Sequence, residues 1–96
     1  MPQVNVNCDY LRAIDLWGAE SQLLQAVEEC NELSKAIIKY LNRGGDRENV
    51  KEEIADVDIM LGQLKCLFSE TDIEDYKEIK LNRLRRLMAE ETQKEE

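Results

Sequence analysis

Apolar residues recur along most of this chain at the three- and four-residue spacing of an α-helix. Residues 19–42 contain no glycine or proline and are mostly good helix formers. The pattern predicts a short helix over 9–17, which Gly18 ends, and longer helices over 19–42, 47–68 and 72–91. Because no strand-like alternation is present, the sequence predicts an all-α fold.

Glycines and polar residues mark the expected ends of these helices. Gly44 and Gly45 stop the second helix, and Asp46 has the right position and side chain to cap the third. Thr71 and Glu74 have the spacing of a capping box, which predicts the start of the fourth helix beside Thr71.

The whole chain, residues 1–96, is expected to form one domain. We expect a compact helical bundle of three main helices plus a short N-terminal helix. An irregular lead-in over 1–7 and a frayed tail over 91–96 complete it. A chain of this length buries only about 65% of the surface that its unfolded form exposes, so a lone monomer would be marginal.

The predicted third helix is apolar on two sides. Its main stripe is Val50, Ile54, Val57, Leu61, Leu64 and Phe68, and its second stripe is Ala55, Ile59, Gly62 and Cys66. A helix that is apolar on two sides is normally buried on two sides. We therefore expect the fold to be completed by oligomerisation, in a homo-oligomer.

Carboxylates interrupt the main stripe of this helix. On a helical wheel at about 100° per residue, Glu53 falls inside the apolar arc and Asp56 at its edge. Glu29 and Glu32 border the apolar stripe of the second helix, whose members are Leu23, Val27, Cys30, Ser34, Ile37 and Leu41. A carboxylate in an apolar face is costly unless it is paired, protonated or bound to metal.

Four such carboxylates on facing helices would suit a hard cation, Mg²⁺ or Mn²⁺. Two ordinary alternatives stay open at this point. Glu29 and Glu32 could form a solvated helix flank, and Glu53 could be a buried carboxylate paired with a lysine or arginine.

The amino-acid composition excludes several kinds of function and site. The chain has 21 acidic and 13 basic residues, a net charge of −8, which argues against nucleic-acid binding. It has no histidine, which excludes histidine metal sites and histidine general bases. Without a long apolar run or a signal-peptide pattern, we expect no membrane contact and a cytoplasmic location. Cys8, Cys30 and Cys66 are then expected to be free thiols.

The predicted fourth helix has cations on its apolar side. Lys80 lies in the middle of a stripe formed by Ile73, Tyr76, Leu84 and Leu87, and Arg83 flanks that stripe. Lys80 is either a structural counter-ion for the carboxylates or a ligand for phosphate.

Two acidic motifs carry a resemblance to a known family. Glu28-Glu29-Cys30-Asn31-Glu32-Leu33, followed by Glu52-Glu53-Ile54-Ala55-Asp56-Val57, resembles the ExxE and ExxD signature of the all-α nucleoside triphosphate pyrophosphohydrolases, the MazG-like group. The segment Trp17-Gly18-Ala19-Glu20-Ser21-Gln22-Leu23 and the later Lys80-x-x-Arg83 are also similar, so the resemblance covers about residues 15–87. The phosphoribosyl-ATP branch of the group usually has a histidine after its second motif, which this chain lacks.

The resemblance implies a short single-domain enzyme that, with Mg²⁺, hydrolyses a nucleoside triphosphate to the monophosphate and pyrophosphate. A metal-activated water would attack the α-phosphorus. The metal ligands would be Glu29, Glu32, Glu53 and Asp56. Glu32, with Glu28 as the second choice, would take the proton of that water.

The resemblance also suggests the substrate contacts. Lys80 and Arg83, from the same or a neighbouring subunit, would neutralise the β- and γ-phosphates. Trp17 or Tyr10 would stack on the base and Gln22 would read its edge, although a core position for Trp17 is the favoured alternative.

A non-catalytic protein is the competing function class: an acidic helical interaction module, or a module that binds nucleotide without hydrolysing it. The inward direction of Glu53 and Asp56 favours the enzyme, because a plain helical bundle would have leucines at those positions.

Overall fold

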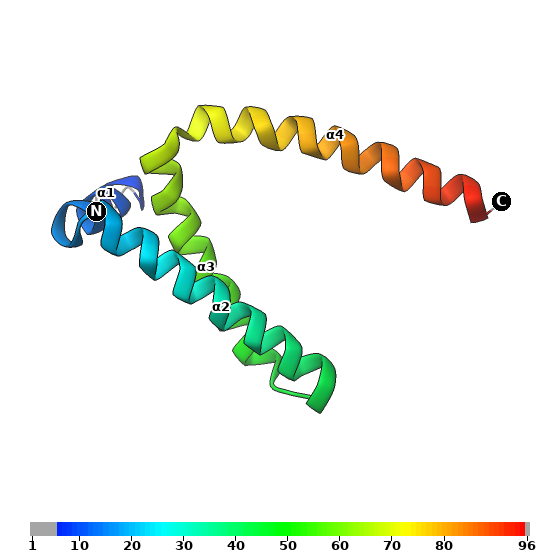
Figure 1. Cartoon of the computed structure of the whole chain (residues 1–96), viewed down its shortest axis with the longest axis horizontal. Helices are drawn as coiled ribbons and strands as arrows, with labels where there is room; N and C mark the ends of the chain where they lie inside the picture. Colours follow the sequence, from blue (N-terminus) through cyan, green and yellow to red (C-terminus); the bar gives the residue numbers. More distant parts are fainter. Residues whose placement is uncertain (1–5, 96) are drawn as a thin grey trace, which may run out of the picture.

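The computed structural model describes residues 6–95, which form four α-helices and no strand. The helices are α1 (Val6–Trp17), α2 (Ala19–Arg43), α3 (Arg47–Phe68) and α4 (Glu70–Glu95). Figure 1 shows α2 and α3 as an antiparallel hairpin, α1 packed at its open end, and α4 leaving from the end of α3. The predicted all-α class and the number of helices are confirmed.

The turn between α2 and α3 is built as the sequence indicates. Gly44 has the left-handed conformation, with φ 61° and ψ 37°, and Gly45 N–H donates to the carbonyl oxygen of Lys39 at 3.3 Å. A Cβ on Gly45 would lie 3.1 Å from the backbone of Lys39, so the turn favours glycine there. The Asp46 carboxylate accepts a hydrogen bond from the Glu48 N–H at 2.9 Å, which confirms the predicted cap.

The other helix ends differ from prediction. Helix α1 begins at Val6, so the expected irregular lead-in fails for residues 6 and 7, and its remainder lies outside the described residues. Helix α4 begins at Glu70 because the Ser69 hydroxyl, rather than Thr71, accepts a hydrogen bond from the N–H of Asp72, at 3.3 Å.

The expected frayed tail is also wrong as far as Glu95, because α4 stays helical to that residue. Residue 96 lies outside the described part. The last turns of α4 are held by local bonds such as the Lys94–Glu91 ion pair and the hydrogen bond from the Thr92 hydroxyl to the Met88 carbonyl oxygen.

The hairpin is closely packed through small residues. Ala26 and Ala36 of α2 and Met60 of α3 are the buried apolar side chains among the described residues, and Gln22 and Gln63 are buried with them. Small side chains let two helix axes approach closely. The side of α2 that packs is therefore rotated away from the predicted stripe, whose Val27, Ile37 and Leu41 stay exposed.

Helix α1 covers part of the second apolar side of α3. The Tyr10 ring lies against Gly62, where an added Cβ would overlap the ring atoms Cε2 and Cζ. The small residue at position 62 therefore serves a contact within the chain. The expectation that this second stripe serves self-association is wrong at Gly62.

The predicted compact bundle does not form within one chain. Helix α4 contacts only α3 among the described helices, and none of its residues is buried. The radius of gyration is 17.4 Å, whereas a compact domain of this length has about 12.5 Å. The stripe of α4 that was expected to face inward is thus largely exposed. Within residues 6–95, no helix is long and apolar enough to cross a membrane.

Candidate metal centre

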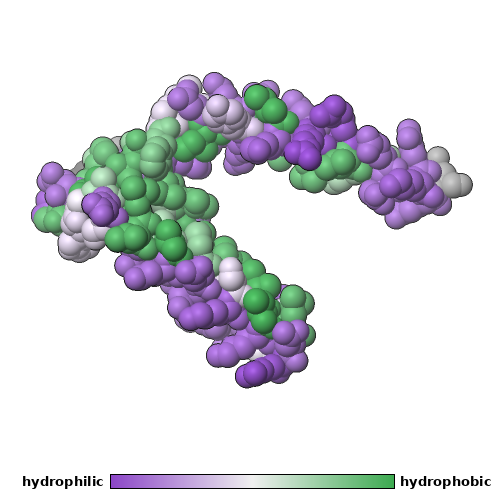
Figure 2. All heavy atoms as spheres, viewed as in Figure 1, coloured by the Kyte–Doolittle hydropathy of each residue, from purple (hydrophilic) through white to green (hydrophobic). Residues whose placement is uncertain are grey.

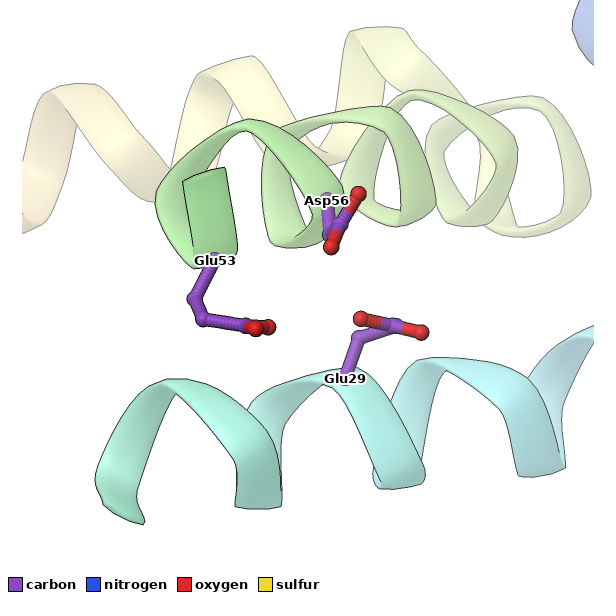
Figure 3. A group of neighbouring side chains, drawn as sticks. All are labelled: Glu29, Glu53 and Asp56. Carbon is purple, nitrogen blue, oxygen red and sulfur yellow. The ribbon is translucent and has the colours of Figure 1, made fainter. Parts of the chain in front are cut away.

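Three carboxylates from two helices converge near the middle of the hairpin. Glu29 of α2 and Glu53 and Asp56 of α3 each offer an oxygen, and these oxygens all lie within 4.8 Å of one another. Figure 3 shows the three side chains pointing into the space between the two ribbons. Glu53 and Asp56 are one helical turn apart on α3, so both can reach Glu29 on the neighbouring α2.

Glu53 is the least solvated member of this carboxylate cluster. Its Oε2 atom is buried and has no hydrogen-bond partner within the described residues. Loss of solvation raises the pKa of Glu53 above its ordinary value of 4.5, and the nearby negative charges of Asp56, Glu29, Glu32 and Glu52 raise it further. Among residues 6–95, no lysine or arginine forms an ion pair with Glu29, Glu53 or Asp56, so the cluster holds negative charge that these residues leave without a cation.

The donor set fits a hard divalent cation. All three groups are carboxylates, and neither nitrogen nor sulfur joins them. Oxygen-only ligands suit Mg²⁺ and Mn²⁺. Glu29 and Glu53 are half-buried whereas Asp56 is exposed, so the cluster is open to solvent and to a ligand on the Asp56 side. The buried, unpartnered Glu53 oxygen is the feature that a cation would compensate.

The side chain of Gln25 orients one carboxylate of the cluster. Its Nε2 donates to Glu29 Oε1 at 2.8 Å, which fixes one oxygen of that carboxylate. Sequence analysis did not single out Gln25. Its position four residues before Glu29 on the same helix is the signal that could have indicated the contact.

Glu32 does not join the other three predicted ligands. It is exposed, and Lys35 Nζ lies 3.4 Å from its Oε1. Its charge still acts on Glu53, so it lies at the edge of the cluster. Glu28, the second choice for the proton acceptor, is also exposed and lines a shallow hollow on α2 together with Glu29 and Glu32.

The residues expected to contact the nucleobase lie near the end of the molecule where α1 meets α2. Trp17 is 63% exposed, which contradicts the favoured core position. Gln22 is only 6% exposed and belongs to the packed side of α2, about 10 Å along the helix from Glu29. Tyr10 packs on Gly62. Of these residues, the single chain leaves Trp17 the most accessible to a ligand.

The expected phosphate ligands lie on a different part of the molecule. Lys80 and Arg83 are exposed on α4, which contacts only α3. Helix α4 leaves from the end of α3 that lies about 18 Å along the helix axis from Asp56 (Figure 1). Because Lys80 is neither buried nor beside the carboxylates, the alternative of a structural counter-ion is wrong for the single chain.

In comparisons with models of known protein families, with curated proteins and with solved structures, no match was found.

Proposed function

We propose that this protein is a Mg²⁺-dependent nucleoside triphosphate pyrophosphohydrolase that also accepts Mn²⁺. It converts an NTP or dNTP and water into the NMP or dNMP and pyrophosphate. The observation that supports this best is the buried, unpartnered Glu53 Oε2 inside a group of three carboxylates from two helices. The resemblance of the two acidic motifs to the MazG-like group supplies the reaction.

Each residue at the cluster has its own role in this proposal. Glu29, Glu53 and Asp56 hold the cation, and Gln25 keeps the Glu29 carboxylate oriented toward it. When bound, Mg²⁺ supplies Lewis acidity and lowers the pKa of a coordinated water. The open side at Asp56 gives the triphosphate access to the cluster.

Glu32 accepts the proton of the attacking water in this proposal. It lies at the edge of the cluster, and its ion pair with Lys35 is exposed on both sides. Exposed ion pairs contribute little free energy, so Glu32 can leave Lys35 and turn toward the cluster. Glu28, one residue before Glu29 and exposed, is the second choice.

Substrate recognition in this proposal needs more than one chain. Lys80 and Arg83 lie on a helix that does not contact α2, so α4 of a second copy would bring them to the phosphates. The enzyme would then act as a homo-oligomer, dimer or tetramer. Trp17 is accessible for stacking on the base, whereas the burial of Gln22 leaves its proposed role in reading the base edge without structural support.

The test is a pyrophosphate-release assay on a panel of NTPs and dNTPs, with Mg²⁺ and with EDTA. Glu53→Gln should abolish release while the variant stays folded. Glu52→Gln is the matched control, because Glu52 is adjacent and exposed and does not belong to the cluster.

Two outcomes of this assay would contradict the proposal. Wild-type turnover in Glu53→Gln would show that the cluster is not the metal site. Absence of release from every triphosphate, in a folded protein whose melting temperature ignores Mg²⁺, would favour the non-catalytic interaction or nucleotide-binding module.

A further inference from the structure

The charged residues of α2 are divided along its length. Residues 19–34 contain four glutamates and no lysine or arginine, whereas residues 35–43 contain three cations and no acidic residue. The three cations follow one another at four-residue intervals, so they form one row on the helix surface. We call them the cation row, and its members are Lys35, Lys39 and Arg43. The row begins three residues after Glu32, at the edge of the carboxylate cluster.

Helical geometry places the cation row on the side of the hairpin where the cluster is open. Around α2, Glu32 lies about 40° and Lys39 about 60° from the buried Ala36, in the same rotational sense. On α3, Asp56 lies about 40° from the buried Met60 in that sense too. Because the two helices are antiparallel, offsets in the same sense reach one side of the hairpin. Figure 2 shows hydrophilic residues along one side of the hairpin as far as the turn.

Two shallow hollows on α2 join the cluster to the cation row. Glu29 and Lys35 are part of the lining of the first hollow, and Lys35, Lys39 and Arg43 are part of the lining of the second. Lys35 and Ile38 line both hollows, so the two adjoin. A ligand that spans them meets carboxylates at one end and cations at the other.

The cations of this row are available to a ligand. Among residues 6–95, neither Lys39 nor Arg43 forms an ion pair. Lys35 lies 3.4 Å from Glu32 Oε1, but its side chain is 74% exposed. Because exposed ion pairs contribute little free energy, a phosphate group can replace Glu32 as the partner of Lys35. That exchange would free Glu32 to turn toward the cluster.

The spacing of the row fits a short phosphate chain. Along the helix axis, Lys35 lies about 9 Å and Lys39 about 15 Å from Glu29. The ammonium group of a lysine is carried on a flexible four-carbon stem, so both lysines can reach back toward the cluster. Arg43 lies about 21 Å from Glu29 and ends α2, where a cation also favours the helix dipole. Only the two lysines are therefore within reach of a triphosphate that the cluster holds.

We propose that Lys35 and Lys39 form a subsite for the β- and γ-phosphates, in the same chain as the carboxylate cluster. The inference rests on the proposed function, because a cation at the cluster anchors the α-phosphate. It also fixes the direction of the substrate. The phosphates point toward the turn, and the nucleoside points toward α1, because α2 has no cation before Lys35. Lys80 and Arg83, by contrast, reach the cluster only from a second copy.

The test measures binding rather than turnover. The probe is inorganic tripolyphosphate with Mg²⁺ in excess, titrated into the full chain by isothermal calorimetry. Lys35→Gln and Lys39→Gln should each raise the Kd about tenfold, because each removes a charged hydrogen bond to phosphate. Circular dichroism should show both variants folded, since the two side chains are exposed.

Lys51→Gln is the matched control. Lys51 is an exposed lysine that pairs with a glutamate three residues away, as Lys35 does, and the substitution changes the net charge equally. It lies about 180° around α3 from Met60, so it points away from the cluster. Its Kd should stay within about twofold of the wild-type value, because a distant exposed charge is screened by salt.

Each outcome supports or overturns the subsite. Absence of tripolyphosphate binding, wild-type affinity in both lysine variants, or equal weakening in Lys51→Gln would overturn it. Binding that persists in EDTA and in Glu53→Gln would indicate an anion site separate from the cluster, which also overturns it. If the lysine variants bind normally while the wild type releases pyrophosphate, the proposed function stands without this subsite. Binding that needs Mg²⁺ and both lysines, in a protein that releases no pyrophosphate, would support the subsite while contradicting the proposed function.

Discussion

At the residue scale, Glu53 is the most informative position in the molecule. Its wheel position already directs it into an apolar arc, and the structure leaves one of its oxygens buried without a partner. Either protonation of Glu53 or a bound cation would remove the free-energy cost of this unpartnered oxygen. Protonation depends on pH, whereas cation binding depends on the metal concentration as well.

The first prediction is the pH dependence of stability in EDTA. Because the pKa of Glu53 is raised in the folded state, the wild type loses free energy of unfolding as the pH rises from 4.5 through the raised value. Glu53→Gln removes that loss, so at pH 7 without metal the variant should be the more stable protein. Urea unfolding should show the difference shrinking as the pH is lowered toward 4.5.

When Mg²⁺ is added, the order of stability should reverse, and the wild type should become more stable than Glu53→Gln. A cation at about 100 times its Kd stabilises the folded state that binds it by about 2.7 kcal/mol. Only the wild type has the full set of ligands to gain from it. A difference between the two proteins that is constant over pH, and equal with Mg²⁺ and EDTA, would show that Glu53 is an ordinary surface carboxylate.

The second prediction distinguishes the two candidates for proton acceptor. Glu32→Gln should lower kcat by about 100- to 10,000-fold, the usual contribution of a general base, and leave the Mg²⁺-dependent rise in melting temperature unchanged. Glu28→Gln should retain activity within about tenfold. The reverse result would assign the role to Glu28, and normal rates in both variants would remove both from the mechanism.

At the element scale, close helix contacts position the site. Ala26 and Ala36 bring α2 near α3, and Gly62 lets α1 lie on α3 through the Tyr10 ring. The carboxylates meet because α2 and α3 pack side by side, and two of the buried residues of α2, Ala26 and Ala36, are small enough to let the helices approach.

The third prediction concerns the contact between α1 and α3. Gly62→Ala should destabilise the protein by about 1–2 kcal/mol, because overpacking against Tyr10 outweighs the gain in helix propensity. In a Tyr10→Ala background the same substitution should stabilise by up to about 1 kcal/mol, because only the propensity gain remains. Denaturant unfolding of the four proteins tests this, and additive effects would mean that the ring does not lie over Gly62 in solution.

At the scale of the whole molecule, the shape of the chain is its main feature. Three helices pack together, while α4 projects with no buried residue, and the longest dimension reaches 54 Å. One copy therefore has an acidic cluster between the two helices of the hairpin, exposed large apolar residues along the hairpin, and a basic segment, residues 77–86, on a separate helix.

The fourth prediction follows from that shape. If the fold depends on a second copy, stability must depend on protein concentration, since each tenfold increase favours the associated state by about 1.4 kcal/mol per association step. Circular-dichroism melts from about 1 to 100 μM should show a rising melting temperature for the wild type. A concentration-independent melt would indicate that one chain is stable alone.

The sequence by itself determined the local structure and pointed to the carboxylates of the candidate site. Helix periodicity, Gly44, Gly45 and Asp46 indicated where α2 ends and α3 begins, because turn and cap preferences are properties of a few neighbouring residues. The inward direction of Glu53 also follows from spacing alone. The absence of histidine excludes imidazole donors, and the carboxylates of the two acidic motifs offer oxygen donors instead.

Only the tertiary structure decided which sides of these helices meet. The regular stripe of α2 looked like the core, yet small residues such as Ala26 and Ala36 form the packed side and Leu41 stays exposed. It also decided that Glu29, Glu53 and Asp56 meet while Glu32 pairs with Lys35, and that Lys80 lies on a helix apart. The physical reason is that a wheel gives directions around one helix, whereas contacts depend on how closely two helices approach and on which surfaces one chain leaves uncovered.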